Sequence, residues 1–255
     1  LNDLGALLST QTLALGGLTL PFTVFATVGM VNAVNMSDGM DGLAGGLCLV
    51  ALMALGIAAA VAGHETWLGL FPVLIAVTAA FLGFNIRSPW RSHARIFMGN
   101  GGSLFLGFAV CWLLIALSQG AQKVISPVVA LWIFALPLLD TVAVMIRRIT
   151  KGHSPFAPDR EHLHHILLLA GYTPSQAVWI MLALAAGLAA IGLGAFYMGI
   201  PDSVLFFGFL TLFGLYVWAM HRAWKLMKAL RREESTPSSR EPVPIERPAE
   251  HRAGE

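Results

Sequence analysis

The sequence predicts an all-α membrane protein, a polytopic bundle of about seven transmembrane helices. Of the 255 residues, 56% are hydrophobic and 12% are charged, whereas roughly 25% are charged in soluble domains. The mean hydropathy is +0.72. Seven apolar runs each approach the ~20 residues that a hydrocarbon core requires. These observations exclude a disordered chain and a soluble globular domain.

The predicted spans follow one another through short connections, at roughly residues 14–35, 43–62, 67–86, 103–119, 125–146, 176–198 and 203–220. Six of them carry no charged residue, and the fifth contains Asp140. An acid is costly inside a membrane, so it faces a polar interior or pairs with a neighbouring helix. Both interpretations of Asp140 stay open at this stage.

The loop charges orient the bundle. Most of the 16 Lys and Arg residues fall in the loops reached after the first span and at the start of the tail, whereas the opposite loops hold Lys123 alone. The positive-inside rule therefore predicts an external N-terminus and a cytoplasmic C-terminus. Because the chain opens outside at Leu1 with an odd number of spans, we expect an N-terminal portion to precede it.

Residues 1–232 are predicted to form one membrane domain. Residues 233–255 mix Pro, Ser and alternating charges and are predicted to form a disordered cytoplasmic tail. The net charge of +2 indicates no nucleic-acid partner. Both cysteines sit in apolar runs and suggest buried thiols rather than a disulfide framework.

The first polar motif, residues 32–46 (NAVNMSDGMDGLAGG), joins the first two spans. Asp38 and Asp41 are three residues apart, so on a helical turn both carboxylates face the same way. Two like charges this close favour a cation between them or a basic partner. Oxygen ligands suit Mg²⁺, which binds one or two carboxylates together with substrate phosphates. The alternative is a solvated loop with Asp caps and Gly turns.

The second motif, residues 95–103 (RIFMGNGGS), precedes the fourth span. Glycines before a helix expose backbone N–H groups that can hold phosphate oxygens. Arg95, with Arg87 and Arg91, supplies countercharge. The alternative is a flexible loop whose arginines only orient the protein in the membrane.

The third motif, residues 147–165 (RRITKGHSPFAPDREHLHH), lies between the fifth and sixth spans and ends in a histidine cluster. Imidazole acts as an acid, a base or a cation near neutral pH. A zinc site and an interfacial cluster without chemistry are the alternatives.

The charge-based orientation places all three motifs on one face of the membrane. Carboxylates for a metal, together with arginines and N–H groups for phosphate, describe a phosphoryl-transfer site. The bilayer location favours a lipid substrate. The residues alone therefore predict metal-dependent chemistry on a phosphorylated lipid at the cytoplasmic face.

Together the three motifs resemble the polyprenyl-phosphate N-acetylhexosamine-1-phosphate transferase family (glycosyltransferase family 4). Residues 32–46 look like its Asn-x-x-Asp-Gly-x-Asp-Gly-Leu signature, and residues 97–107 look like its Gly-Asp-x-Gly-Ser loop. Residues 154–165 look like the branch that makes lipid-linked N-acetylglucosamine (GlcNAc). The resemblance covers roughly residues 1–232.

The resemblance implies transfer of GlcNAc-1-phosphate from UDP-GlcNAc to undecaprenyl phosphate in a bacterial inner membrane. The reaction releases UMP, uses Mg²⁺ or Mn²⁺, and begins synthesis of a cell-surface polysaccharide of the O-antigen or lipopolysaccharide type. The exact sugar, the polyprenol and a homodimer are left open. The implied residues are catalytic Asp38, Asp41, His162, His164 and His165; substrate-binding Asn35, Arg95, Ser103, Arg148 and Asp159; and metal-binding Asn100, Asp38 and Asp41.

The sequence departs from the family pattern in two places. An early Asp-Asp pair of the family is absent from this chain, and position 100 is Asn where the pattern has Asp. An amide can bind Mg²⁺ through its oxygen but brings no charge. The alternative is therefore an inactive member or fragment that retains nucleotide-sugar or lipid binding. A transporter is disfavoured, because its polar residues would gather at mid-membrane.

Overall fold

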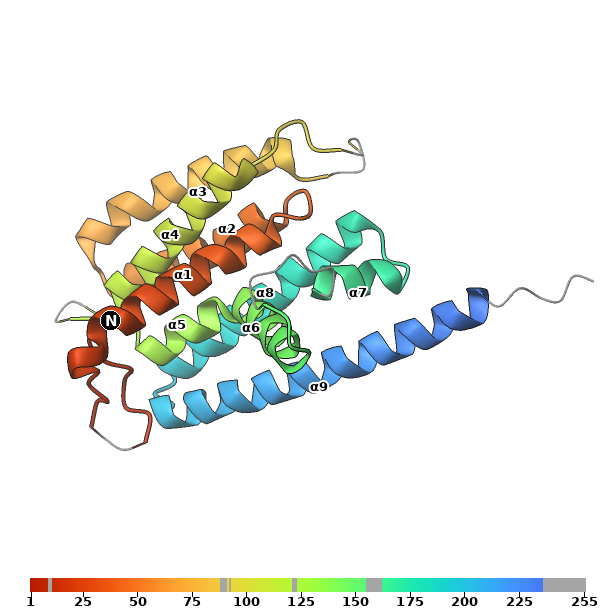
Figure 1. Cartoon of the computed structure of the whole chain (residues 1–255). Helices are drawn as coiled ribbons and strands as arrows, with labels where there is room; N and C mark the ends of the chain where they lie inside the picture. Colours follow the sequence, from red (N-terminus) through yellow and green to blue (C-terminus); the bar gives the residue numbers. More distant parts are fainter. Residues whose placement is uncertain (9–10, 88–90, 92, 121–122, 155–161, 236–255) are drawn as a thin grey trace, which may run out of the picture.

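The computed structural model describes residues 1–8, 11–87, 91, 93–120, 123–154 and 162–235, and it confirms the predicted all-α fold (Figure 1). After a short 3₁₀ helix at Gly16–Leu18, the helices are α1 (Thr19–Ser37), α2 (Leu43–Val61), α3 (Glu65–Asn85), α4 (Gly99–Ser118), α5 (Pro127–Ile133), α6 (Ala135–Thr150), α7 (Leu163–Leu169), α8 (Pro174–Tyr197) and α9 (Asp202–Ser235). Within the described residues, six segments are long and apolar enough to cross a membrane, or seven if α5 and α6 count together.

The fifth predicted span differs from the expected continuous helix. It is broken into α5 and α6, whose axes are bent by 83°. Pro137 lacks an N–H group, and in a continuous helix its ring would meet the carbonyl of Ile133 four residues earlier. The break leaves Pro137 in the first turn of α6, where proline is tolerated. Hydropathy predicts one continuous span at 125–146 and does not detect the effect of this proline.

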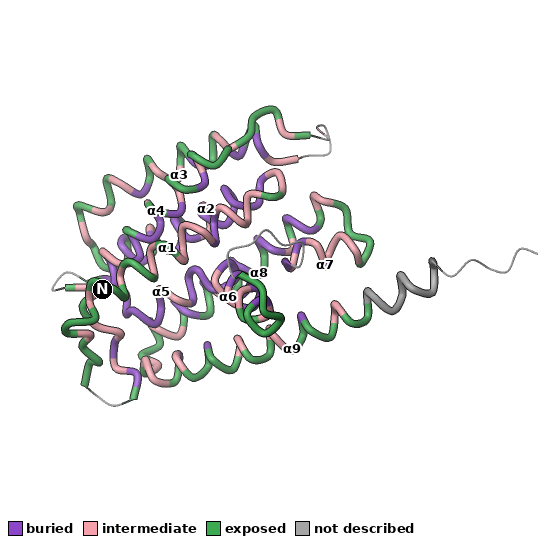
Figure 2. Tube along the Cα trace, in the orientation of Figure 1, coloured by how far each residue is buried: buried purple, intermediate pink, exposed green. Residues whose placement is uncertain are grey.

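The core of the bundle is centred on α2, which packs against α3, α8 and α4. Figure 2 shows buried residues concentrated on the inner helices and exposed residues on the outer faces of α3 and α9. Close packing requires small residues here: a Cβ on Gly46 would lie 2.7 Å from Leu182 Cδ2 of α8. Large apolar side chains such as Val77 and Trp218 point outward, as expected where a bundle meets lipid.

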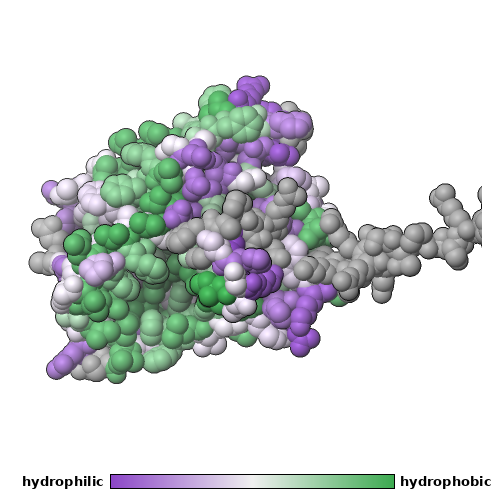
Figure 3. Space-filling view, viewed as in Figure 1, coloured by the Kyte–Doolittle hydropathy of each residue, from purple (hydrophilic) through white to green (hydrophobic). Residues whose placement is uncertain are grey.

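The polar connections gather at one end of the molecule. In Figure 1 the α1–α2 turn, the α3–α4 connection and α7 all lie at the right-hand end. In Figure 3 hydrophilic side chains collect toward this end, whereas the opposite part of the visible face is mostly hydrophobic. The structure thus brings the three motifs to one end of the bundle, as the sequence predicts.

α9 runs to Ser235 and so includes the first three residues of the predicted tail. The remainder of that tail, residues 236–255, lies outside the described residues.

The contact between α5 and α8 gives a direct test of this packing. A Cβ on Gly192 would lie 2.3 Å from Trp132 Cβ, whereas Gly187, on the same helix, has nothing within 4 Å. Overpacking of this kind costs about 1–3 kcal/mol. We expect Gly192→Ala to lower the thermal unfolding temperature in detergent and Gly187→Ala to leave it unchanged or slightly higher. Equal unfolding temperatures for the two variants would contradict the packing described here.

Candidate functional site

The turn between α1 and α2 is held in place by a buried asparagine that the sequence analysis missed. The backbone N–H of Gly42 donates to Asn85 Oδ1 at 2.8 Å, and Asn85 Nδ2 donates to the carbonyl of Ile96 at 2.8 Å. Gly42 has a φ of +87°, and a Cβ there would lie 2.7 Å from Ile86 Cγ1. Only glycine fits this position without strain. Asn85 therefore ties the first motif to the connection that leads into the second.

The two carboxylates of the first motif have different surroundings. Asp41 Oδ2 accepts a hydrogen bond from Arg87 Nε at 2.7 Å and from the backbone N–H of Ala94 at 3.3 Å. Asp41 thus has the basic partner that the sequence left as one of two options. Within the described part of the chain, the half-buried side chain of Asp38 has no hydrogen bond or ion pair. Burial first, and then the charge of Asp41, raise the pKa of Asp38.

The second motif is helical from Gly99 onward rather than a loop throughout. α4 begins at Gly99, so the glycines at positions 101 and 102 belong to its first turn. Ser103 is fully buried, its Oγ accepts a hydrogen bond from Asn35 Nδ2 at 2.8 Å, and its hydroxyl reaches the carbonyl of Asn100 at 3.2 Å. The bond between Asn35 and Ser103 joins two predicted binding residues from separate motifs.

The other residues predicted from the second and third motifs are more dispersed. Asn100 and Arg95 are exposed, and Arg148 is buried near the end of α6. None of these three lines the cavity described below. Asp159 lies outside the described residues.

The histidine cluster is anchored by Asp140. Asp140 Oδ2 lies 2.8 Å from His162 Nδ1, and Oδ1 accepts from the backbone N–H of Leu163 at 3.0 Å and from the hydroxyl of Tyr216 at 2.7 Å. The carboxylate therefore connects α6, the start of α7 and α9. Of the two interpretations that the sequence left open for Asp140, the structure supports hydrogen bonding to neighbouring elements. Tyr216 was missed, because a single tyrosine within an apolar span carries no motif.

The three histidines stack beside the first motif. The rings of His162 and His164 are nearly parallel with centroids 5.7 Å apart, and those of His164 and His165 are 4.1 Å apart. A Cβ on Gly39 would lie 3.6 Å from His164 Nε2, so the first and third motifs are in contact. Burial, and then the charges of His165 and His162, lower the pKa of His164 to about 4. At neutral pH His164 is therefore an uncharged imidazole.

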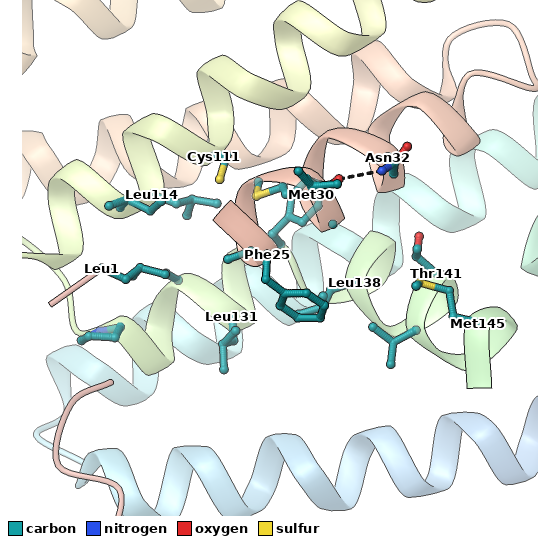
Figure 4. A pocket seen from close by; sticks show the side chains of 18 of the residues that line it. Leu1, Phe25, Met30, Asn32, Cys111, Leu114, Leu131, Leu138, Thr141 and Met145 are labelled. Carbon is teal, nitrogen blue, oxygen red and sulfur yellow. Dashed lines mark hydrogen bonds between the residues drawn. The ribbon is translucent and has the colours of Figure 1, made fainter. Parts of the chain in front are cut away.

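A cavity of about 760 Å³ runs from this polar end into the bundle. Its polar end is lined by Asn32, Asn35, Gly39, His162, His164 and His165. Figure 4 shows its apolar part between α1, α4, α5 and α6, with Phe25, Leu131 and Leu138 among the labelled side chains around it. The volume falls within the range of about 300–1,000 Å³ that is common for ligand pockets.

The predicted magnesium ion would need ligands among the side chains of this site. Among the described residues, no group of three or more His, Cys, Asp or Glu side chains is placed to hold a metal. The described residues therefore offer no complete set of protein ligands for the zinc alternative. Mg²⁺ needs only one or two carboxylates beside substrate phosphates, and Asp38, close enough to Asp41 for that charge to raise its pKa, offers such a carboxylate.

Comparison with known proteins shows what the chain is similar to. Residues 1–118 match the family model described as Glycosyl transferase family 4. The chain is also 40% identical over 233 residues to the undecaprenyl-phosphate alpha-N-acetylglucosaminyl 1-phosphate transferase of Escherichia coli K12. The chain therefore resembles glycosyl transferase family 4 over residues 1–118 and this transferase over most of its own length.

Transferases of the same name in other bacteria align to this chain about equally well. The one in Haemophilus influenzae is 41% identical and the one in Yersinia pestis 39%, each over 91% of this chain. The aligned region covers 63% of the Escherichia coli protein, 65% of the Haemophilus protein and 64% of the Yersinia protein. The chain thus spans just under two thirds of the length of these curated relatives.

The lowered pKa of His164 makes stability depend on pH. Between pH 4 and 6.5 the unfolded chain binds a proton at this position that the folded chain does not, so the free energy of unfolding rises with pH. Above pH 6.5 His164 is neutral in both states, and the free energy of unfolding has its full value. As the pH falls toward 4, only the unfolded chain binds the proton, and the free energy of unfolding decreases. With 1.36 kcal/mol per pKa unit, this decrease is on the order of 3 kcal/mol.

We therefore expect His164→Asn to unfold in mixed detergent micelles with a shallower pH dependence over this range than the unchanged chain. His153→Asn, at an exposed position, is the matched control and should retain the original slope. Identical slopes for the unchanged chain and His164→Asn would show that His164 is not held as the neutral imidazole.

Proposed function

We propose that this chain is the catalytic membrane domain of a transferase that moves GlcNAc-1-phosphate from UDP-GlcNAc to undecaprenyl phosphate and releases UMP. The similarity to undecaprenyl-phosphate alpha-N-acetylglucosaminyl 1-phosphate transferases supports these substrates. The observation that carries the proposal is the lining of the cavity. One end is lined by residues of the first motif and by the histidines, and the remainder is apolar.

The cavity suits a lipid phosphate as the acceptor. Phe25, Leu131 and Leu138 offer an apolar wall for the first isoprene units of the polyprenyl chain. At the polar end, Asn32 and His165 offer hydrogen bonds to the phosphate. The longer part of the polyprenyl chain would remain in the bilayer. A ligand with an apolar body and one anionic end matches this distribution of side chains.

In the proposed reaction, an oxygen of the acceptor phosphate attacks the β-phosphorus of UDP-GlcNAc. The new P–O bond forms as the bond from the β-phosphorus to the bridging oxygen breaks, and the electron pair leaves with UMP. Catalysis of this kind depends mainly on positioning and on charge stabilisation. The neutral ring of His164 can hydrogen-bond a phosphate oxygen without adding charge, and Arg87 keeps Asp41 fixed beside Asp38.

Asp38 and Asp41 would hold Mg²⁺, which when bound neutralises diphosphate charge and polarises the phosphoryl group. The raised pKa of Asp38 supports this assignment, because a nearby cation would relieve the repulsion between the two carboxylates. Asn100 is exposed at the start of α4 and would contribute at most an uncharged oxygen.

We place the active end on the cytoplasmic face of a bacterial inner membrane. The support is the concentration of Lys and Arg in the connections at that end, since positively charged loops stay in the cytoplasm. The product would begin synthesis of a cell-surface polysaccharide.

A second candidate function is favoured by Asn100. A member that lacks the charged residue at this position could bind the nucleotide sugar or the lipid without transferring the phospho-sugar. Binding without transfer is the outcome that would identify it.

The direct test is label transfer in membranes that contain the complete reading frame of this protein, supplied with UDP-[¹⁴C]GlcNAc, undecaprenyl phosphate and Mg²⁺. We expect label to enter lipid, and we expect Asp38→Asn to reduce the rate by about 100-fold or more, because one preorganised electrostatic contact to the reacting group is worth this much. Glu65 is an exposed acid at the first residue of α3, at the other end of that helix from Asn85. Glu65→Gln should therefore keep the full rate.

Two results would count against the transferase. Equal rates for Asp38→Asn and the unchanged protein would remove the first motif from the chemistry. Bound UDP-GlcNAc with no label in lipid would favour the inactive alternative.

A further inference from the structure

The network around Asp140 determines which nitrogen of His162 carries a proton. Both side chains are buried, with Asp140 6% and His162 5% exposed. Asp140 Oδ1 is occupied by two donors, the N–H of Leu163 and the hydroxyl of Tyr216, which leaves Oδ2 facing His162 Nδ1. An ionised carboxylate only accepts hydrogen bonds, so Nδ1 carries the proton and donates it. His162 Nε2 is then the ring atom with hydrogen-bonding capacity to spare.

His162 is also one of the residues that line the polar end of the cavity. The nearly parallel ring of His164, with its centroid 5.7 Å away, packs against one face of the His162 ring. Asp140 holds the Nδ1 edge of the ring, so Nε2 is the polar atom that His162 can offer to a ligand in the cavity. A histidine whose orientation and tautomer are fixed by a buried carboxylate is a recurrent arrangement in catalytic sites.

We propose that Asp140 and Tyr216 are positioning residues of the transferase site, which hold the proton on Nδ1 of His162 and present Nε2 to the phosphate of the bound lipid or nucleotide. This inference rests on the proposed function and adds two residues that belong to none of the three motifs. Asp140 acts through His162, and Tyr216 acts through Asp140.

The break between α5 and α6 makes this arrangement reachable. Asp140 lies in α6, which packs against α1, α8 and α9, and α7 in turn packs against α8 and α9. The 83° bend directs α6 away from the line of α5. An acid in a membrane span has to find partners inside the protein, and here it finds them at the start of α7 and in the middle of α9.

Replacement of Asp140 by Asn is expected to reverse the tautomer of His162. The N–H of Leu163 needs an acceptor, so the amide oxygen of Asn takes that place and its NH₂ group faces His162 Nδ1. Nδ1 then has to accept, and the proton moves to Nε2. Tyr216→Phe removes one donor but retains the Leu163 contact, so the tautomer should be unchanged.

The first readout is ¹⁵N NMR of histidine-labelled chain in nanodiscs, with the His162 signal assigned from a His162→Gln sample. We expect a protonated Nδ1 in the unchanged chain and in Tyr216→Phe, and a protonated Nε2 in Asp140→Asn. A protonated Nε2 in the unchanged chain, or the same tautomer in all three samples, would overturn the proposal.

The second readout is steady-state transfer by the complete reading frame. We expect Asp140→Asn to lower kcat by about 100-fold or more, the usual range for loss of a positioned proton donor or acceptor. The KM for UDP-GlcNAc should change only a few-fold. Tyr216→Phe should lower kcat by a few-fold, and Thr211→Val, which removes a hydroxyl from the same helix away from the network, should leave it unchanged. A purely structural role for Asp140 would reduce the amount of folded protein and leave kcat per folded site intact.

The two readouts separate this inference from the function on which it rests. If the unchanged protein transfers no label, the proposed function fails while the NMR result still decides the tautomer. If it transfers label and Asp140→Asn keeps the original kcat, the positioning role fails and the transferase stands.

Discussion

The arrangement of the site depends on the hydrogen bonds that one buried carboxylate makes within a membrane span. Asp140 has little access to water, and an unpartnered acid at that position would be very costly. Its two oxygens are met by His162, Leu163 and Tyr216, which come from the start of α7 and from α9. Those contacts hold the histidine cluster against the bundle, and the cluster in turn closes the polar end of the cavity beside the first motif.

The cavity combines two environments that the proposed substrates require together. Its apolar wall is made by helices that a continuous fifth span would arrange differently, because α5 and α6 each contribute lining residues on either side of the break. Its polar end receives groups from the first and third motifs. The low pKa of His164 follows from this crowding, since burial and then the neighbouring His165 and His162 disfavour a positive charge on its ring.

Much of this arrangement could be predicted from the sequence, and the rest depended on contacts distant along the chain. Hydropathy located the spans, and the pattern of Lys and Arg residues predicted that the three motifs lie on one side of the membrane. Pro137 is a local sequence signal for the break between α5 and α6, but hydropathy does not detect it. Asn85 and Tyr216 gave no such signal, because their roles arise from Gly42 and Asp140 in other helices. The partner of Asp41 was similarly undetermined until Arg87 was placed beside it.

The central claim is that the lipid chain and the phosphate occupy one continuous site. The most direct measurement is photo-crosslinking of the complete protein in membranes with a polyprenyl phosphate that carries a diazirine in its first isoprene units, followed by peptide mass spectrometry. The account predicts label on α1 around Phe25 and on α5–α6 around Leu131 and Leu138, displaced by excess undecaprenyl phosphate. Label confined to the outer faces of α3 or α9, or label that undecaprenyl phosphate does not displace, would contradict it.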